Sequence, residues 1–192
     1  MTANGTPPTS PQDGDFEPWV RVSERVIHQT RFLTLREDEV RLPTGQTLRY
    51  GVVACGHCVG VLPFVGRDHV VMVRQWRYIA GCVTLEMPTG GVHAGELPEV
   101  AAQRELMEEA GYRAGRLVPL GAYHTSKSSI DETAHLYIGE DLVPAAAASD
   151  PTEDTRPVTV LFSDVLAMVL DGRITDSMTI IAVLRAARLR GL

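Results

Sequence analysis

Short runs in which hydrophobic and polar residues alternate predict β-strands in the first part of the chain. They begin near Trp19, after an opening stretch rich in Pro, Gly, Ser, Thr and Asp. Pro43-Thr44-Gly45 has the composition of a turn, so the runs on either side of it are expected to form an antiparallel hairpin. Two denser apolar runs follow and predict core strands. The strand segments are 19–27, 32–41, 46–53, 59–64 and 69–73.

The hydrophobic period becomes that of an α-helix between Glu96 and Ala110. Pro98 suits the first turn of this helix, and Gly111 suits the position just after its end. Further strands and two more helices are predicted downstream. They are strands at 116–122, 133–138 and 158–162, a loop at 144–157, a short helix from its N-cap Ser163 to Gly172, and an amphipathic helix that starts at Thr175-Asp176.

The composition predicts one soluble domain. The chain has 192 residues, of which 44% are hydrophobic, and this is enough for a core without covalent staples. We expect residues 1–17 to be a disordered tail and residues 18–192 to be a single domain. No apolar run reaches the length of a membrane span. The three cysteines are an odd number without a signal-peptide-like segment, so we expect a cytoplasmic protein without a disulfide framework.

The charge of the chain restricts its partners. A formal net charge of −6 argues against nucleic acid, because affinity for nucleic acid comes mostly from Lys and Arg. A small anionic ligand is compatible with this charge if metal ions or local arginines offset the repulsion.

The predicted helix at 96–110 carries three carboxylates on one face. Glu105, Glu108 and Glu109 gather there, apart from the apolar residues that face the core. Like charges at this spacing repel, and Arg104 can supply part of the compensating charge. Carboxylate oxygens at this spacing suit hard divalent cations such as Mg²⁺. The simpler alternative is a solvated helix face without function.

The spacing of the residues around this helix argues against the simpler alternative. The segment follows the pattern Gly90-x5-Glu96-x7-Arg104-Glu105-Leu106-x-Glu108-Glu109-x-Gly111-Tyr112. It resembles the signature of the Nudix hydrolase family at every fixed position. With ordinary residue frequencies, such a coincidence arises in on the order of one window in 10⁸.

This resemblance implies a fold and a reaction. The fold is α/β, a Nudix-type α/β/α sandwich with a mixed β-sheet, preceded by an N-terminal antiparallel β element. We expect that element at residues 18–53 and the catalytic core at residues 54–192. The implied reaction is metal-dependent hydrolysis of a phosphoanhydride bond in a nucleoside diphosphate linked to a group X, with Mg²⁺ or Mn²⁺ as cofactor. A homodimer formed through the N-terminal element is implied by the resemblance alone.

The resemblance also implies the metal ligands. Glu105 and Glu109 are expected to be the principal ligands, assisted by Glu108. Gly90 would permit a close approach of the backbone, so that the carbonyl of Thr89 becomes a further ligand. The bound cation would neutralise phosphate oxygens and acidify the attacking water.

Other residues are expected to assist this chemistry. Arg104 would orient the carboxylates by ion pairing, and Glu96 would brace the loop before the helix. A mobile glutamate in a later loop joins the metals or activates water in related members, and we place this role on Glu153. Asp150 and Asp154 are competing candidates, and a solvated acidic loop is the plain alternative.

Outside the signature, the chain resembles the ADP-ribose pyrophosphatase branch of the family. The resemblance is carried by VRQWRY at 73–78 and LEMPTG at 85–90. In that branch the equivalents of Arg77 and Glu86 contact the substrate, whereas a surface arginine and a structural carboxylate are the alternatives. Phe32 is expected either to stack on the adenine or to pack in the core.

One loop departs from the pattern of that branch. A Ser-Pro-Gly element is usual there, but this chain has Ser126-Lys127-Ser128, and only the glutamate that follows, Glu132, is kept. Proline fixes a backbone dihedral and glycine permits positive φ, so we expect the loop to have a different shape. Glu132 and Lys127 are expected to contact the substrate. Lys127 could reach an additional phosphate or a sugar oxygen, or it could simply be solvated.

Two other signals in the sequence are weaker. Cys55 and Cys58 have the spacing of half a zinc site or of a dithiol pair, but the other half is missing, so we interpret them as ordinary thiols. His124 lies near the substrate loop in sequence and is interpreted as a hydrogen-bonded structural histidine.

Three functions are therefore considered. The first is hydrolysis of the pyrophosphate bond in ADP-ribose or a related nucleoside diphosphate sugar, giving a nucleoside monophosphate and a sugar phosphate. The second is hydrolysis of dinucleoside polyphosphates or modified nucleoside triphosphates, and the segment 85–90 favours the first over it. The third is a nucleotide-sugar sensor without turnover, against which the intact signature argues.

Overall fold

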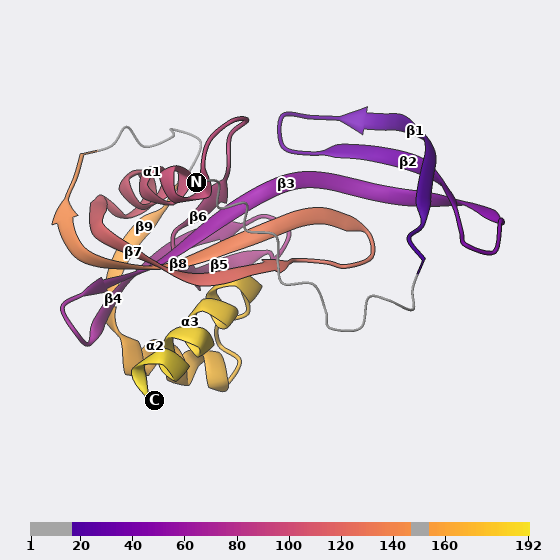
Figure 1. Ribbon diagram of the computed structural model, residues 1–192. Coiled ribbons are helices and arrows are strands. Elements are labelled where there is room, and N and C mark those ends of the chain that lie inside the picture. Colours follow the sequence, from indigo (N-terminus) through magenta and orange to yellow (C-terminus); the bar gives the residue numbers. More distant parts are fainter. Residues whose placement is uncertain (1–16, 147–153) are drawn as a thin grey trace. The chain divides into compact units, whose positions relative to one another are not determined.

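The computed structural model describes residues 17–146 and 154–192 (Figure 1). The chain divides into two compact units. The first contains the residues up to Gly56 together with Ala122–Thr133, and the second contains His57–Gly121 and Ala134–Leu192. Almost all of the predicted tail at 1–17, and the candidates Glu153 and Asp150, lie outside the described residues.

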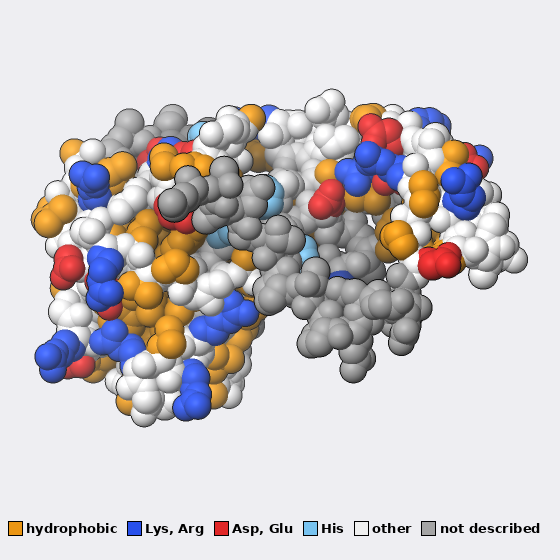
Figure 2. Space-filling model, in the orientation of Figure 1, with side chains coloured by type: hydrophobic (Ala, Val, Ile, Leu, Met, Phe, Trp, Pro, Cys, Tyr) orange, Lys and Arg blue, Asp and Glu red, His pale blue; other side chains and the backbone are white. Residues whose placement is uncertain are grey.

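The first unit is built on antiparallel strands. Strand β1 (Val20–Gln29) pairs with β2 (Thr34–Arg41), and β2 pairs with the first part of β3 (Thr47–Val65). The predicted turn between β2 and β3 is present: the N–H of Gly45, whose φ is 85°, donates to the carbonyl of Leu42 at 2.9 Å. Figure 2 shows hydrophobic and charged side chains interspersed over these strands. The antiparallel N-terminal element is therefore confirmed.

Strand β3 is longer than the sequence predicted. The two segments expected at 46–53 and 59–64 are parts of one strand, because the backbone continues through Gly56, which has a φ of 81°. Up to Ala54 the strand pairs with β2, and from Cys58 it pairs with β6 (Thr89–Gly91). The change of partner coincides with the glycine.

In the second unit, the sheet lies between helices. Helix α1 (Pro98–Ala110) covers one side of the strands, and α2 (Phe162–Leu170) and α3 (Ser177–Arg190) lie on the other side (Figure 1). The predicted α/β class with a mixed sheet is confirmed. The remaining strands are β4 (His69–Arg77), β5 (Cys82–Glu86), β7 (Tyr112–His124), β8 (Ile130–Pro144) and β9 (Arg156–Leu161). Strand β4 lies between β5 and β9, and β8 lies between β3 and β7.

The core under α1 explains why this helix is held firmly. Leu106 and the alanines of α1 pack against valines of β3 and β4 and against Tyr137 of β8, and all of them are buried. Burial of a leucine or valine side chain contributes about 1.5–3 kcal/mol relative to leaving it exposed. Glu105 and Glu109 are buried on the same helix, next to Leu106 and Ala110, so the packing of the apolar side chains determines where these two carboxylates lie.

The helix ends follow local signals with one exception. Pro98 begins α1, and Gly111 ends it in the left-handed conformation, as predicted. Asp176 is the N-cap of α3, as predicted. The prediction of Ser163 as the N-cap of α2 was wrong, because β9 runs directly into a helix that begins at Phe162. The N–H of Phe162 donates to the carbonyl of Asp68 at 2.7 Å, which replaces a side-chain cap.

None of the helices within the described ranges is both long and apolar enough to cross a membrane.

Candidate active site

Two glutamates of α1 are buried one helical turn apart. Glu105 is 7% exposed and Glu109 is 5% exposed, whereas Glu108 is more accessible. Residues four apart on a helix lie on the same face, and this face of α1 meets β6 at Thr89 and Gly90. Buried carboxylates need hydrogen bonds or a cation, because burial penalises the charged form.

The backbone of β6 meets these carboxylates directly. The N–H of Thr89 donates to Oε2 of Glu109 at 2.7 Å. A Cβ atom on residue 90 would lie 2.0 Å from the carboxyl carbon of Glu105, which is far shorter than any real contact. Gly90 is therefore required for this close approach. Its φ is not positive, so the reason is the lack of space for a side chain and not the backbone conformation.

Arg104 supplies the positive charge that the carboxylates need. Its guanidinium donates to Oε1 of Glu105 at 2.6 Å and to Oε2 of Glu108 at 3.2 Å. It also donates to both carboxylate oxygens of Glu96 and to the carbonyl of Gly91. The hydrogen bonds to Glu96 raise the pKa of Arg104 above its usual value, and the same bonds hold the pKa of Glu96 below its usual range. Arg104 thus ties the helix to the loop that precedes it.

The donor set suits a hard divalent cation. The described residues contain no group of three or more His, Cys, Asp or Glu side chains already arranged around a metal position. Mg²⁺ does not require such a cage, because it binds through one or two carboxylates and completes its shell with water and substrate phosphate oxygens. Glu105 and Glu109, held against a backbone strand that lacks a Cβ at Gly90, fit this description.

A second charged pair lies in the same unit. Arg77 ends β4, and its guanidinium donates to both oxygens of Glu86 on β5, with distances of 2.5–3.2 Å. Burial raises the pKa of Glu86, but the hydrogen bonds from Arg77 and from the hydroxyl of Thr84 outweigh it, so this pKa lies below its usual value. The hydrogen bonds to Glu86 raise the pKa of Arg77, and attraction from Glu109 and Asp176 adds to this effect. Arg77 is therefore attracted by Glu109 of α1 as well as by its partner Glu86.

Phe32 lies in the first unit, between β1 and β2. Its side chain is 71% exposed, so the alternative that it packs in the core was wrong. The short connection between the strands turns it outward, since the hydroxyl of Thr30 accepts the N–H of Phe32 at 3.1 Å. The guanidinium of Arg31 lies 4.4 Å from the centre of the ring.

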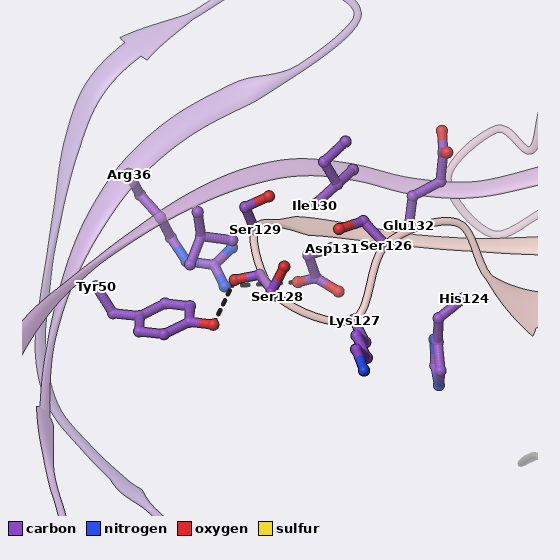
Figure 3. A pocket seen from close by; sticks show the side chains of 11 residues that line it. Arg36, Tyr50, His124, Ser126, Lys127, Ser128, Ser129, Ile130, Asp131 and Glu132 are labelled. Carbon is purple, nitrogen blue, oxygen red and sulfur yellow. Dashed lines mark hydrogen bonds and ion pairs between the residues drawn. The ribbon is translucent and has the colours of Figure 1, made fainter.

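Lys127 and Glu132 also lie in the first unit. Lys127 is in the loop that departs from the family pattern, and Glu132 is on β8, just after that loop. This loop borders a cavity of about 340 Å³ (Figure 3). It is held by a hydrogen bond from the hydroxyl of Tyr50 to the carbonyl of Ser128, and by an ion pair between Arg36 and Asp131 at 3.5 Å. Figure 3 shows the side chains of Lys127 and His124 extending in the same direction, while that of Glu132 extends to the opposite side of the loop.

The loop accommodates serine where the family has glycine. Within the described part of the chain, Asp141 is the only non-glycine residue with a positive φ, which is 54°. Ser128 therefore does not adopt the conformation that a glycine would permit. His124 contacts the hydroxyl of Thr133 at 3.3 Å, which agrees with its interpretation as a hydrogen-bonded histidine.

The remaining predicted positions have simple surroundings. Asp154, a competing candidate for the base, is exposed and pairs with Arg156 at 3.2 Å. No disulfide joins Cys55, Cys58 and Cys82 in the described residues. Sequence reasoning missed Thr84, and it marked Asp176 only as the start of a helix. The link of these two residues to Glu86 and Arg77 depends on strand register and on the packing of α3.

The comparisons with known proteins extend over most of the chain. The family model described as NUDIX domain matches residues 56–170. A second model, described as nucleoside diphosphate sugar hydrolase N-terminal domain, matches residues 19–53. The two matches together cover the strands of both units and the helix that carries the glutamates.

Individual relatives agree with the family models. The chain is 35% identical over 159 residues to the methanol dehydrogenase activator of Bacillus methanolicus, covering 82% of this chain and 86% of the relative. It is 29% identical over 164 residues to the ADP-ribose pyrophosphatase of Bacillus subtilis, covering 84% and 89%. A crystal structure of an ADP compounds hydrolase superimposes with a TM-score of 0.80 at 20% identity, covering 92% of this chain and 96% of that one, and shows the same fold.

The intact signature, the buried glutamates against β6 and the matching family model lead to one conclusion. The chain belongs to the Nudix hydrolase family.

Proposed function

We propose that this protein hydrolyses the pyrophosphate bond of ADP-ribose or a related nucleoside diphosphate sugar, giving a nucleoside monophosphate and a sugar phosphate. The observation that carries the proposal is the pair of buried glutamates, Glu105 and Glu109, held against the backbone of Thr89 and Gly90. The N-terminal match to nucleoside diphosphate sugar hydrolases and the relative named ADP-ribose pyrophosphatase support the choice of substrate class.

In this proposal, Mg²⁺ or Mn²⁺ is held by Glu105 and Glu109, with assistance from Glu108 and the carbonyl of Thr89. When bound, the cation supplies neutralisation of phosphate oxygens and acidification of water. Arg104 keeps the glutamates in place through its ion pairs with Glu105 and Glu108. The ligands must be deprotonated to bind metal, and Arg104 provides a positive charge beside two of them.

Other residues of the chain have proposed roles around the substrate. Arg77, oriented by Glu86, presents its guanidinium to a phosphate oxygen, since part of that side chain remains accessible beyond the ion pair. The exposed ring of Phe32 is available for stacking on the base. Lys127 and Glu132 contact the substrate. Glu153, which lies outside the described residues, is our proposed general base.

We further propose that the protein is a cytoplasmic homodimer. Every residue of β1 is exposed, although the strand contains several large hydrophobic side chains, and an exposed apolar strand invites pairing with another chain. The exposed hydrophobic residues of this region are Trp19, Val20, Val22, Val26 and Ile27. Cysteines without disulfides are typical of a reducing compartment.

The proposal is tested with purified protein, Mg²⁺ and a panel of ADP-ribose, ADP-glucose, UDP-glucose, GDP-mannose, NADH, diadenosine polyphosphates and nucleoside triphosphates. The Glu109→Gln variant removes one proposed ligand, and the Asp164→Asn variant, an exposed change on α2, is the control. We expect cleavage of one nucleotide sugar that falls about 10²-fold or more in Glu109→Gln and persists in Asp164→Asn. Tight binding of a nucleotide sugar without metal-dependent turnover would refute hydrolysis and favour a sensor.

A further inference from the structure

The segment between β5 and β6 connects the two charged parts of the site. It starts at Glu86, which binds Arg77, and it ends at Thr89, whose N–H binds Glu109. On the side of β3, its backbone is fixed by strand pairing of Thr89 with Gly60. The N–H of Val61 on β3 also donates to the carbonyl of Pro88 at 3.0 Å. On its other side it meets α3.

A side chain of α3 binds the middle of this segment. The N–H of Met87 donates to Oγ1 of Thr179 at 3.0 Å. Both residues are 0% exposed, so water cannot take the place of the hydroxyl. Because buried backbone amides are almost always paired, this bond determines where the segment can lie once it has left β5.

The N-terminus of α3 holds Thr179 in the orientation that this bond requires. The carboxylate of the N-cap, Asp176, accepts the N–H of Thr179 at 2.7 Å. The backbone N–H of Thr179 therefore binds the N-cap, and the side-chain hydroxyl of Thr179 accepts the N–H of Met87. Attraction from Asp176 also adds to the effects that raise the pKa of Arg77.

Close packing over Gly60 reinforces the same contact. A Cβ atom on Gly60 would lie 2.2 Å from Cε of Met87, 3.2 Å from Cε of Met178 and 3.3 Å from Cγ2 of Thr89. The first turn of α3 and the segment thus converge on one point of β3. A glycine at position 60 is what allows this convergence.

We infer that Thr179 is a positioning residue for the backbone that Thr89 and Gly90 present to Glu105 and Glu109. Helix α3 is then part of the metal site, although it lies beyond residues 56–170 that the NUDIX model matches. The inference rests on the proposed function for the identity of the ligand, but the contact itself does not depend on turnover. Supporting residues of this kind typically change metal affinity by about 10–100-fold when altered.

The test compares Thr179→Val, which keeps the shape and removes the hydroxyl, with Thr179→Ser, which keeps the hydroxyl. Val183→Ala, a truncation in the buried face of the same helix, is the control for lost stability. Three quantities are measured in the full chain: the Mn²⁺ dissociation constant from the electron paramagnetic resonance signal of free Mn²⁺, hydrogen exchange of peptides spanning 86–91, and the melting temperature.

We expect Thr179→Val to weaken Mn²⁺ binding by about 10-fold or more and to accelerate exchange in 86–91, and we expect Thr179→Ser to restore both. Val183→Ala should lower the melting temperature without either change. The inference is overturned if Thr179→Val binds Mn²⁺ with wild-type affinity and shows wild-type hydrogen exchange in 86–91. It is also overturned if Val183→Ala changes both quantities as much as Thr179→Val does. If Thr179→Val does not fold, Thr179→Cys, a weak acceptor, replaces it with the same expected directions. Mn²⁺ binding that depends on Thr179 in a protein without turnover would refute the proposed hydrolysis and still support the positioning role.

Discussion

Replacing Gly90 by alanine tests the central feature of the site, the approach of β6 to Glu105. The added Cβ would lie 2.0 Å from the carboxyl carbon of Glu105 and 2.0 and 2.3 Å from its oxygens. An ordinary contact requires about 3.4 Å or more, so the carboxylate must move by more than an ångström. Because the displaced atoms are the end of a flexible side chain, the fold can absorb the change at a cost of about 1–3 kcal/mol or less.

The consequence for activity should be large even though the protein still folds. Misplacement of a participating group by about 1 Å can reduce the rate by about 10²-fold, which corresponds to about 2.7 kcal/mol of barrier. We therefore expect Gly90→Ala to stay folded, with a melting temperature lowered by about 10 °C or less, but to lose about 10²-fold in metal-dependent hydrolysis, with a higher Mg²⁺ concentration at half-maximal rate. Steady-state kinetics across a Mg²⁺ titration, alongside thermal melts, measure both effects.

The neighbouring glycine provides the matched control. A Cβ on Gly91 would meet no described atom within 4 Å, and its φ is not positive. Gly91→Ala should accordingly retain activity, since its carbonyl remains available to Arg104. The reasoning is refuted if Gly90→Ala keeps the wild-type Mg²⁺ dependence, or if both substitutions reduce activity to the same extent.

Three further outcomes are expected. The pKa of Glu86 is lowered in the folded protein. The ion pair of Glu86 with Arg77 therefore stabilises the folded state at pH values above the ordinary Glu pKa of about 4.3, and this stabilisation is lost as the pH falls through the pKa of Glu86 in the folded state. Urea unfolding of Glu86→Gln should therefore depend less on pH in this acid range than that of the wild type, and equal slopes would contradict the assignment. Mg²⁺ at 100 times its dissociation constant should add about 2.7 kcal/mol to the free energy of unfolding, and this gain should disappear in Glu109→Gln; an unchanged gain would place the cation elsewhere. Phe32→Ala should change the free energy of unfolding by less than about 0.5 kcal/mol, because the ring is exposed, while raising KM for the nucleotide, and a large loss of stability would show that the ring packs in the folded protein.

The sequence determined much of the site because the signals that specify a helix are local. The periodicity of residues 96–110, with Pro98 and Gly111 at the ends, is sufficient to place Glu105 and Glu109 on one face of α1. The hairpin turn at Gly45 and the N-cap at Asp176 are likewise visible in a few adjacent residues. The resemblance to the family signature then supplied the expected roles of these glutamates as metal ligands.

What only the tertiary structure decided was the set of contacts between distant segments. The hydrogen bond from Met87 to Thr179 spans 92 positions, and the pair of Arg77 and Glu86 depends on the register of β4 against β5. Thr179, Thr84 and Asp176 have nothing in their local sequence that indicates these partners. The partners are set by how strands register and helices pack, and these are properties of the whole folded chain, since the free energy that selects them comes from burial summed over many side chains.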